Sequence, residues 1–213
     1  SSSDIAIDFH SSNLHLMELP QIRIIKDFEK KLLPLAKKTN VDLIWVHPNA
    51  DIFESTLGFN LNRSKIPTLV IEHDNFIKRE DFDDALIKSL EEYKPDLIVL
   101  AGFMRILTPN FIKPYQGKLI NIHPSLLPKY PGLNTHQKVI DNNDPEHGVT
   151  VHFVDENLDS GPICGQSSMK VKSKDIAELE KSIHELEHEL YPKVIQDFAK
   201  GNLKLKKGKL IRK

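Results

Sequence analysis

The sequence predicts an α/β protein with a Rossmann-like, doubly wound and mostly parallel sheet that carries helices on both faces. Short apolar stretches alternate with longer segments of helical periodicity, which is the pattern of strand–helix–strand units. Residues 97–101 are almost continuously apolar between Pro95 and Gly102, as expected of a central strand covered on both faces. Polar side chains at 121 and 123 end another strand, at the kind of edge where such sheets bind ligands.

Each element follows from its own pattern. Alternating or continuous apolar runs predict strands at residues 5–9, 41–46, 68–71, 97–101, 119–122, 149–153 and 164–171. Helical spacing predicts helices at 22–38, 79–93, 136–142 and 173–199, the last kinked at Pro192. Residues 124–134 form a Pro-rich loop that is long enough to be an active-site flap. We therefore expect one domain over residues 1–213, whose N-terminal half, about 1–100, is mononucleotide-binding-like.

Composition narrows the class of protein. Hydrophobic residues make up 39% and charged residues 28% of 213, which fits a globular chain and argues against disorder. The single cysteine, Cys164, allows no intramolecular disulfide and stands in an apolar stretch, so we expect a buried thiol in a reducing compartment. No apolar run approaches the roughly 18 residues of a membrane span, and no signal pattern opens the sequence. The expected location is cytoplasmic, with no membrane partner.

The C-terminal tail is basic although the net charge is only −1. Residues 200–213 hold six Lys and one Arg with no acid. Such a tail can bind nucleic acid or membrane, but Leu203, Leu205, Leu210 and Ile211 are interleaved with the charges. We favour a solvated strand pair that turns near Gly208, and expect no nucleic-acid partner.

Three residues near strand ends form a candidate catalytic set. Asn121 and His123 are two positions apart, so both point to one face of their strand, and Pro124 ends it. Asp159 lies in a turn-rich loop after the strand at 149–153. An amide can stabilise an oxyanion, an imidazole can exchange protons, and a carboxylate orients the imidazole. Acyl or formyl transfer to an amine needs these three groups and no Ser or Cys nucleophile; a satisfied core histidine is the structural alternative.

A second histidine motif occurs in the last helix. Residues 184–188 read H-E-L-E-H, which matches the zinc-protease pattern H-E-x-x-H. No histidine follows as a third ligand, and Pro192 interrupts the helix shortly afterwards. We therefore expect no metal and interpret His184 and His188 as two side chains on a solvated flank, with a zinc peptidase as the rival reading.

A third candidate follows the first predicted strand. Ser11, Ser12 and Asn13 lie in a turn that leads toward a helix, where backbone N–H groups and short polar side chains bind phosphate. The alternative is that Ser12 or Asn13 only caps the helix.

The longest motifs decide between these readings. The run AGFMRIL at 101–107, the run NIHPSLLPKYPG at 121–132 and the run LDSGP at 158–162 strongly resemble the phosphoribosylglycinamide formyltransferases, folate-dependent enzymes of purine biosynthesis. The resemblance covers about residues 76–198. It implies formyl transfer from 10-formyltetrahydrofolate to the amine of glycinamide ribonucleotide, with Asn121, His123 and Asp159 as the catalytic residues. It also places the folate site in the C-terminal half, about 101–213.

The resemblance also implies binding residues. Folate would contact Asn121 together with Arg79, Met104, Arg105, Ile106, Leu107 and Asp155. Glycinamide ribonucleotide would contact Ser11, Ser12, Asn13 and Glu187. The assembly would be a monomer or a homodimer that binds only small molecules and no metal.

The segment at 8–13 departs from this family. Family members carry Ser-Gly-Asn-Gly-Ser-Asn after the first strand, whereas this chain reads Asp-Phe-His-Ser-Ser-Asn and has lost both glycines. Glycine permits close backbone approach to a phosphate. Three alternatives therefore stay open: a formyltetrahydrofolate deformylase, which usually carries a further N-terminal domain, a sugar-nucleotide formyltransferase, and a non-catalytic folate- or nucleotide-binding protein.

Overall fold

The computed structural model describes residues 6–10, 21–25, 30, 33–34, 43–47, 68–72, 77–91, 94–101, 103, 106–206 and 208–213. The chain forms two compact units, Ser1–Lys94 and Pro95–Lys213. The predicted site residues Ser11, Ser12, Asn13, Met104 and Arg105 lie outside the described residues.

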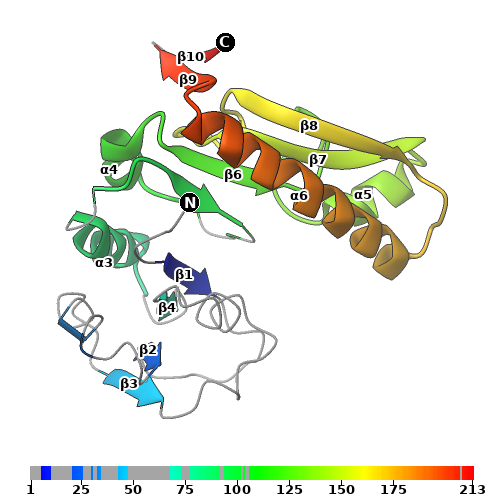
Figure 1. Cartoon of the computed structure of the whole chain (residues 1–213). Helices are drawn as coiled ribbons and strands as arrows, with labels where there is room; N and C mark the ends of the chain where they lie inside the picture. Colours follow the sequence, from blue (N-terminus) through cyan, green and yellow to red (C-terminus); the bar gives the residue numbers. More distant parts are fainter. Residues whose placement is uncertain are drawn as a thin grey trace. The chain divides into compact units, whose positions relative to one another are not determined.

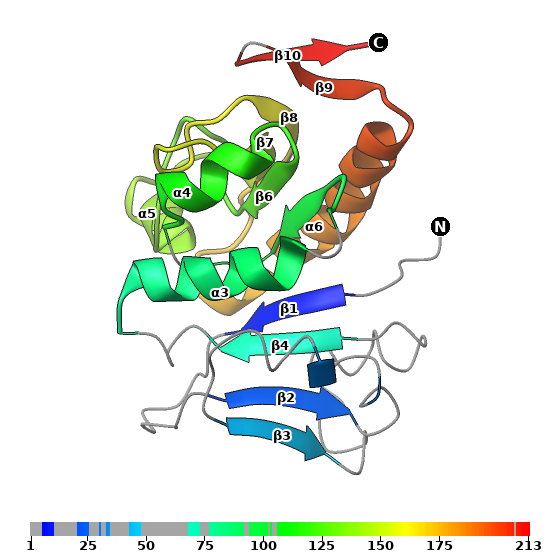
Figure 2. The same cartoon turned by 90° about the vertical axis from the view of Figure 1, so that its left-hand side faces the viewer.

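The first unit contains a four-stranded mixed sheet and a helix. Strands β1 (Ala6–His10), β2 (Gln21–Ile25), β3 (Leu43–His47) and β4 (Thr68–Glu72) are arranged in the order β1-β4-β2-β3 (Figure 2). Helix α3 (Arg79–Glu91) follows. Phe82, Ala85, Leu86 and Leu90 are buried on it, which confirms the apolar face expected from their spacing.

The helix predicted at 22–38 is wrong in its first turn. Gln21–Ile25 forms strand β2, which pairs in parallel with β3 and antiparallel with β4. The segment reads Gln-Ile-Arg-Ile-Ile, and β-branched residues lose side-chain freedom in a helix but fit a pleated sheet. The sheet pairing thus outweighed the helical spacing of the apolar residues further along.

The second unit contains a second mixed sheet of four strands. They are β5 (Ile98–Leu100), β6 (Leu119–His123), β7 (Glu146–Phe153) and β8 (Ile163–Lys170), in that spatial order. Helix α4 (Pro109–Ile112) and the 3₁₀ helix η5 (Lys113–Tyr115) lie in the crossover between the parallel strands β5 and β6. Helix α5 (Thr135–Asp141) precedes β7.

The α/β fold class is confirmed, but the sheets are mixed instead of mostly parallel. Strand β7 runs antiparallel to both β6 and β8. The connection from β7 to β8 is too short for the crossover that a parallel pair requires, so the chain turns back directly. One result is that residues of β6 and β7 face each other in register near the end of β6.

Helix α6 (Ile176–Ala199) packs along β7 and β8 (Figure 1). It begins at Asp175, whose carboxylate accepts from the backbone N–H groups of Ala177 and Glu178. The core beneath it combines Ile120, Ile122, Val151, Phe153, Cys164, Tyr191, Val194 and Leu203. Burial raises the pKa of the Cys164 thiol to about 11, so this cysteine behaves as the buried apolar residue predicted from sequence.

The basic tail forms the predicted strand pair. Strands β9 (Leu203–Lys206) and β10 (Lys209–Arg212) are antiparallel, and Gly208 between them has a φ of +72°. The Arg212 guanidinium donates to the Cys164 carbonyl, which ties the tail to β8. Across the described parts of the chain, no helix is long and apolar enough to cross a membrane.

Candidate active site

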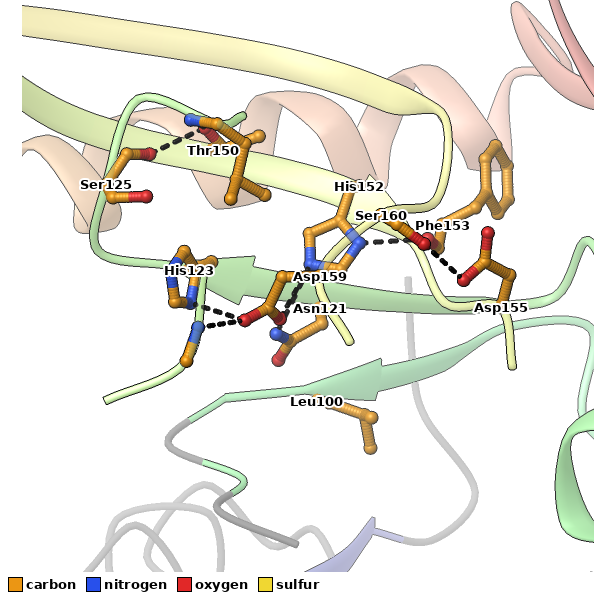
Figure 3. Close-up of polar contacts among 12 residues, drawn as sticks. Leu100, Asn121, His123, Ser125, Thr150, His152, Phe153, Asp155, Asp159 and Ser160 are labelled. Atoms are coloured by element: carbon orange, nitrogen blue, oxygen red, sulfur yellow. Dashed lines mark hydrogen bonds and ion pairs between the residues drawn. The ribbon is translucent and has the colours of Figure 1, made fainter. Parts of the chain in front are cut away.

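The side chains of Asn121, His123 and His152 gather around Asp159 at the end of β6 (Figure 3). Asn121 and His123 share one face of β6 because they are two residues apart. Strand β7 lies antiparallel to β6, with His152 opposite Asn121 and Thr150 opposite His123. Asp159 comes from the loop between β7 and β8. Three separate segments therefore meet at one point.

His123 is fixed through both ring nitrogens. Its Nε2 lies 2.9 Å from the Tyr130 carbonyl oxygen, to which it donates, and its Nδ1 lies 3.5 Å from Asp159 Oδ2. The residue is 6% exposed. Because both neighbours are acceptor oxygens, only an imidazolium can donate to both. The Tyr130 contact orients the ring and leaves Nδ1 as the atom that faces Asp159.

Asp159 receives polar contacts from three directions. The Gly132 N–H donates to Oδ2 over 2.8 Å, and His152 Nε2 lies 3.6 Å from Oδ1. Burial acts to raise the pKa of Asp159. The hydrogen bonds from His152 and Gly132 and the charges of His123 and His152 act in the opposite direction, and their combined effect is larger. The pKa of this carboxyl is therefore below its ordinary value. Asp159 is a carboxylate at neutral pH.

The loop that presents Asp159 is held by local contacts. Asp155 Oδ1 accepts from the Asn157 N–H at 3.0 Å and from the Ser160 hydroxyl at 2.9 Å. A Cβ at Gly161 would come within 1.8 Å of the Phe153 carbonyl oxygen, so only glycine fits there. Asp159 itself has a φ of +48°. The turn therefore places a carboxylate at a position that side chains other than Asn or Asp rarely occupy.

The flap after His123 is anchored by two side chains of the antiparallel strands. The Thr150 hydroxyl donates to the Ser125 carbonyl at 2.6 Å and accepts from the Leu127 N–H at 3.1 Å. Gln166 Nε2 donates to the Leu127 carbonyl at 2.8 Å and to the Thr150 hydroxyl at 2.9 Å. These bonds fix the start of the segment whose Tyr130 carbonyl and Gly132 N–H reach His123 and Asp159.

The chain is similar to known proteins over most of its length. The family model described as formyl transferase matches residues 24–195. The phosphoribosylglycinamide formyltransferase of Escherichia coli is 46% identical over 152 residues, covering 70% of this chain and 72% of the relative. The chain belongs to the formyl transferase family.

Solved structures extend the likeness to the fold. The phosphoribosylglycinamide formyltransferase of Coxiella burnetii is 35% identical with a TM-score of 0.66, over 92% of this chain and 94% of its own. The glycinamide ribonucleotide transformylase 1 of Symbiobacterium toebii is 26% identical with a TM-score of 0.68, over 94% and 98% of the two chains. The formyl transferase match spans both compact units, and the single-domain interpretation stays a prediction.

The structure places the predicted site residues in different parts of the fold. Asn121, His123 and Asp159 lie together as the sequence predicted. Asp155 supports the loop of Asp159, and Arg79 opens helix α3 in the first unit. Ile106 is 51% exposed, whereas Leu107 is 5% exposed and belongs to the core.

His152 is a polar member of this site that sequence reasoning missed. Its Nδ1–H donates to the Phe153 carbonyl at 2.9 Å, and its Nε2 lies 3.5 Å from Asn121 Nδ2. The same Nε2 also faces Asp159, so His152 links the Asn121 amide to the carboxylate. The signal was present in the sequence, because His152 is the next-to-last residue of the strand that leads into the loop of Asp159. Only the antiparallel register shows that it faces Asn121.

The H-E-x-x-H segment lies on α6, and its histidines differ from His123 and His152 in being exposed. His184, Glu185 and His188 are exposed, whereas Leu186 and Glu187 are partly buried. Burial raises the pKa of Glu187, while His184 and His188 act to lower it. Within the described ranges, no three His, Cys, Asp or Glu side chains are grouped to hold a metal ion. The exposed flank expected for His184 and His188 is what the helix presents.

Proposed function

We propose that this chain transfers the formyl group of 10-formyltetrahydrofolate to the amine of glycinamide ribonucleotide, a step of de novo purine biosynthesis. One observation carries the proposal: an amide, an imidazole and an ionised carboxylate meet at the end of β6 in a member of the formyl transferase family. Relatives named for this reaction align over most of the chain. No protein nucleophile is required, because the substrate supplies the amine.

The amine nitrogen attacks the formyl carbon, and the carbonyl oxygen becomes the oxyanion of a tetrahedral intermediate. Asn121 Nδ2 donates to this oxyanion, and the positive charge of the protonated His123 beside it stabilises the developing negative charge. Asn121 Oδ1 is buried and has no hydrogen-bond partner among the described residues. An orphaned buried acceptor requires an explanation, and an N–H of the attacking amine supplies the missing donor. The amide would then hold the nucleophile and the developing charge together.

Asp159 completes the proton balance. The attacking amine loses one proton as the new C–N bond forms, and the departing folate nitrogen gains one as its bond to the formyl carbon breaks. Asp159 stabilises the imidazolium of His123 and relays the amine proton to that nitrogen through a water molecule. Its lowered pKa fits the first role, since the group stays ionised beside the histidine.

The remaining residues bind the two substrates. Folate is assigned to Arg79, Asp155 and the segment Met104, Arg105, Ile106 and Leu107, where the exposed Ile106 offers an apolar contact. Glycinamide ribonucleotide is assigned to Ser11, Ser12, Asn13 and Glu187, whose carboxylate can accept from ribose hydroxyls. The burial that raises the pKa of Glu187 is consistent with a carboxyl partly withdrawn from water on α6. A cytoplasmic location and a monomeric or homodimeric state remain predictions.

The decisive experiment measures tetrahydrofolate formation from 10-formyltetrahydrofolate with and without glycinamide ribonucleotide. The proposal expects turnover that depends on the nucleotide amine, with one formylated product for each folate released. Release without an acceptor would identify a deformylase. Turnover only with amino-sugar nucleotides would identify a different formyltransferase. Folate binding without turnover on any acceptor would indicate a binding protein and would contradict the proposal.

A further inference from the structure

Tyr191 is a buried polar residue that the mechanism above does not use. It lies on α6 and is 8% exposed. Its hydroxyl lies 2.6 Å from the Leu100 carbonyl oxygen and 3.2 Å from the Ile120 carbonyl oxygen, and donates to both. Burial raises the pKa of this phenol far above its ordinary value. The Tyr191 hydroxyl therefore keeps its proton and acts as a hydrogen-bond donor, not as an acid or a base.

The two carbonyls occupy special places in the fold. Leu100 is the last residue of β5, four positions before Met104, where the segment assigned to folate begins. Ile120 directly precedes Asn121 on β6. In the parallel register Leu100 lies beside Asn121. A single hydroxyl thus holds the carbonyl at the end of β5 and the carbonyl one residue before Asn121.

The helix that carries Tyr191 supplies a third part. Glu187 lies one turn earlier on α6, and residues four apart share a helix face. The charge of Glu187 also acts on the Tyr191 phenol, since it contributes to raising the pKa of Tyr191. The folate segment, the Asn121 amide and the carboxylate assigned to ribose therefore all extend from elements joined at this hydroxyl.

We propose that Tyr191 is a positioning residue, whose hydroxyl sets the place of Asn121 relative to the end of β5. This inference rests on the proposed formyl transfer. The oxyanion exists only near the transition state, so a displaced Asn121 amide lowers kcat more than it changes KM. A residue needed only for packing would act through its ring, which fills the core with Val194 and Ile120.

The substitution Tyr191→Phe removes the hydroxyl and keeps the ring. We expect kcat to fall about tenfold, with KM for both substrates within about twofold, because small displacements of catalytic groups carry large rate costs. The matched control is Ser89→Ala, which also removes a buried hydroxyl, one that donates to the Ala85 carbonyl at 2.9 Å inside α3. It should leave kcat unchanged. A Tyr191→Phe protein with the kcat of the control would overturn the proposal.

A double-mutant cycle separates positioning from general destabilisation. In an Asn121→Ala background, Tyr191→Phe should lower kcat less than about twofold further, since the amide that Tyr191 positions is already gone. A full tenfold loss in both backgrounds would show that Tyr191 does not act through Asn121. 4-Aminophenylalanine at position 191 retains a donor at the same place and should restore most of the lost rate. Failure of this rescue would contradict the proposal. The 4-aminophenylalanine protein can be compared directly with the parent, so this test also works when the Phe variant is poorly soluble.

Backbone hydrogen exchange gives a readout that needs no turnover. In Tyr191→Phe, peptides containing Ala101 and Asn121 should exchange faster than in the parent, whereas Ser89→Ala should leave them unchanged. Unchanged exchange in Tyr191→Phe would overturn the positioning role. If Tyr191→Phe exchanges faster than the parent but the parent has no acceptor-dependent turnover, Tyr191 still shapes the site. Formyl transfer is then excluded as the function.

Discussion

The second unit contains two histidine–carboxylate sets, and only one of them is built into a network. His123 and Asp159 are nearly buried, fixed by the Tyr130 carbonyl and the Gly132 N–H, and joined to Asn121 through His152. On α6, His184 and His188 are exposed although their spacing matches a metalloprotease motif. Spacing along one helix places side chains on a common face, but chemistry also requires burial and partners from other segments. The two sets give opposite expectations for the same substitutions.

The largest effect is expected at His123. Replacing His123 with Asn removes the positive charge beside the oxyanion, and kcat should fall by roughly 10² to 10⁴, the range of a positioned acid–base group. His184→Asn is the matched control on the exposed helix and should keep kcat within about twofold. Steady-state kinetics on both variants measures kcat, and thermal unfolding checks that each variant is folded. Near-full turnover of His123→Asn would remove the histidine from the mechanism.

A smaller effect is expected where the backbone supports Asp159. Gly132 has a φ of +76°, and a Cβ there would touch Leu158 Cδ2 at 3.4 Å. Gly132→Ala should therefore shift the N–H that donates to Asp159 and lower kcat by about tenfold. Gly208→Ala imposes the same backbone strain at a φ of +72°, with no heavy atom within 4 Å of the added carbon. Equal kcat for the two variants would show that the Gly132 contact has no role in turnover.

The third prediction distinguishes the two readings of the helix motif. Glu187→Gln should raise KM for glycinamide ribonucleotide several-fold, about the difference between a charge-assisted and a neutral hydrogen bond, with little change in kcat. Glu185→Gln, at the position where a zinc peptidase carries its general base, should leave both constants unchanged. Initial rates at varied nucleotide concentration provide the test. Activity that is lost in Glu185→Gln or on chelation would favour the metal reading.

The smallest expected effect concerns stability and leaves turnover at neutral pH unchanged. Burial lowers the pKa of His147 to about 4, and its Nε2 lies 2.9 Å from Nδ1 of His136. The folded state thus binds this proton less readily than the unfolded chain, whose pKa is near 6.5. Stability is complete above that value and falls as the pH drops toward 4.

Between pH 7 and pH 5 this group should cost about 2 kcal/mol of unfolding free energy. Urea unfolding at the two pH values measures it. His147→Gln should show a smaller difference than the parent, whereas the exposed His184→Gln should retain the parent's full difference. A pH dependence that is identical in all three proteins would exclude His147 as its source.

The sequence predicted the parts of the site that depend on local patterns. Asn121 and His123 share a strand face because the side-chain period of a strand is two, and Pro124 marks its end. Phe82, Leu86 and Leu90 followed from helical spacing in the same way. His152 was missed because its importance depends on pairing between β6 and β7, and nothing local sets that register. Residues 22–25 were misassigned to a helix because sheet partners distant in the sequence determine whether a β-branched segment forms a strand or a helix.

The central claim is that His123 and Asp159 act as one catalytic unit. The most direct test measures kcat for His123→Asn, Asp159→Asn and the double variant. If the carboxylate acts through the imidazole, the double variant should be about as slow as the slower single variant. Once His123 is replaced, Asp159 has no catalytic role left to lose. If the two losses instead multiply, the residues act independently and this account of the site is wrong.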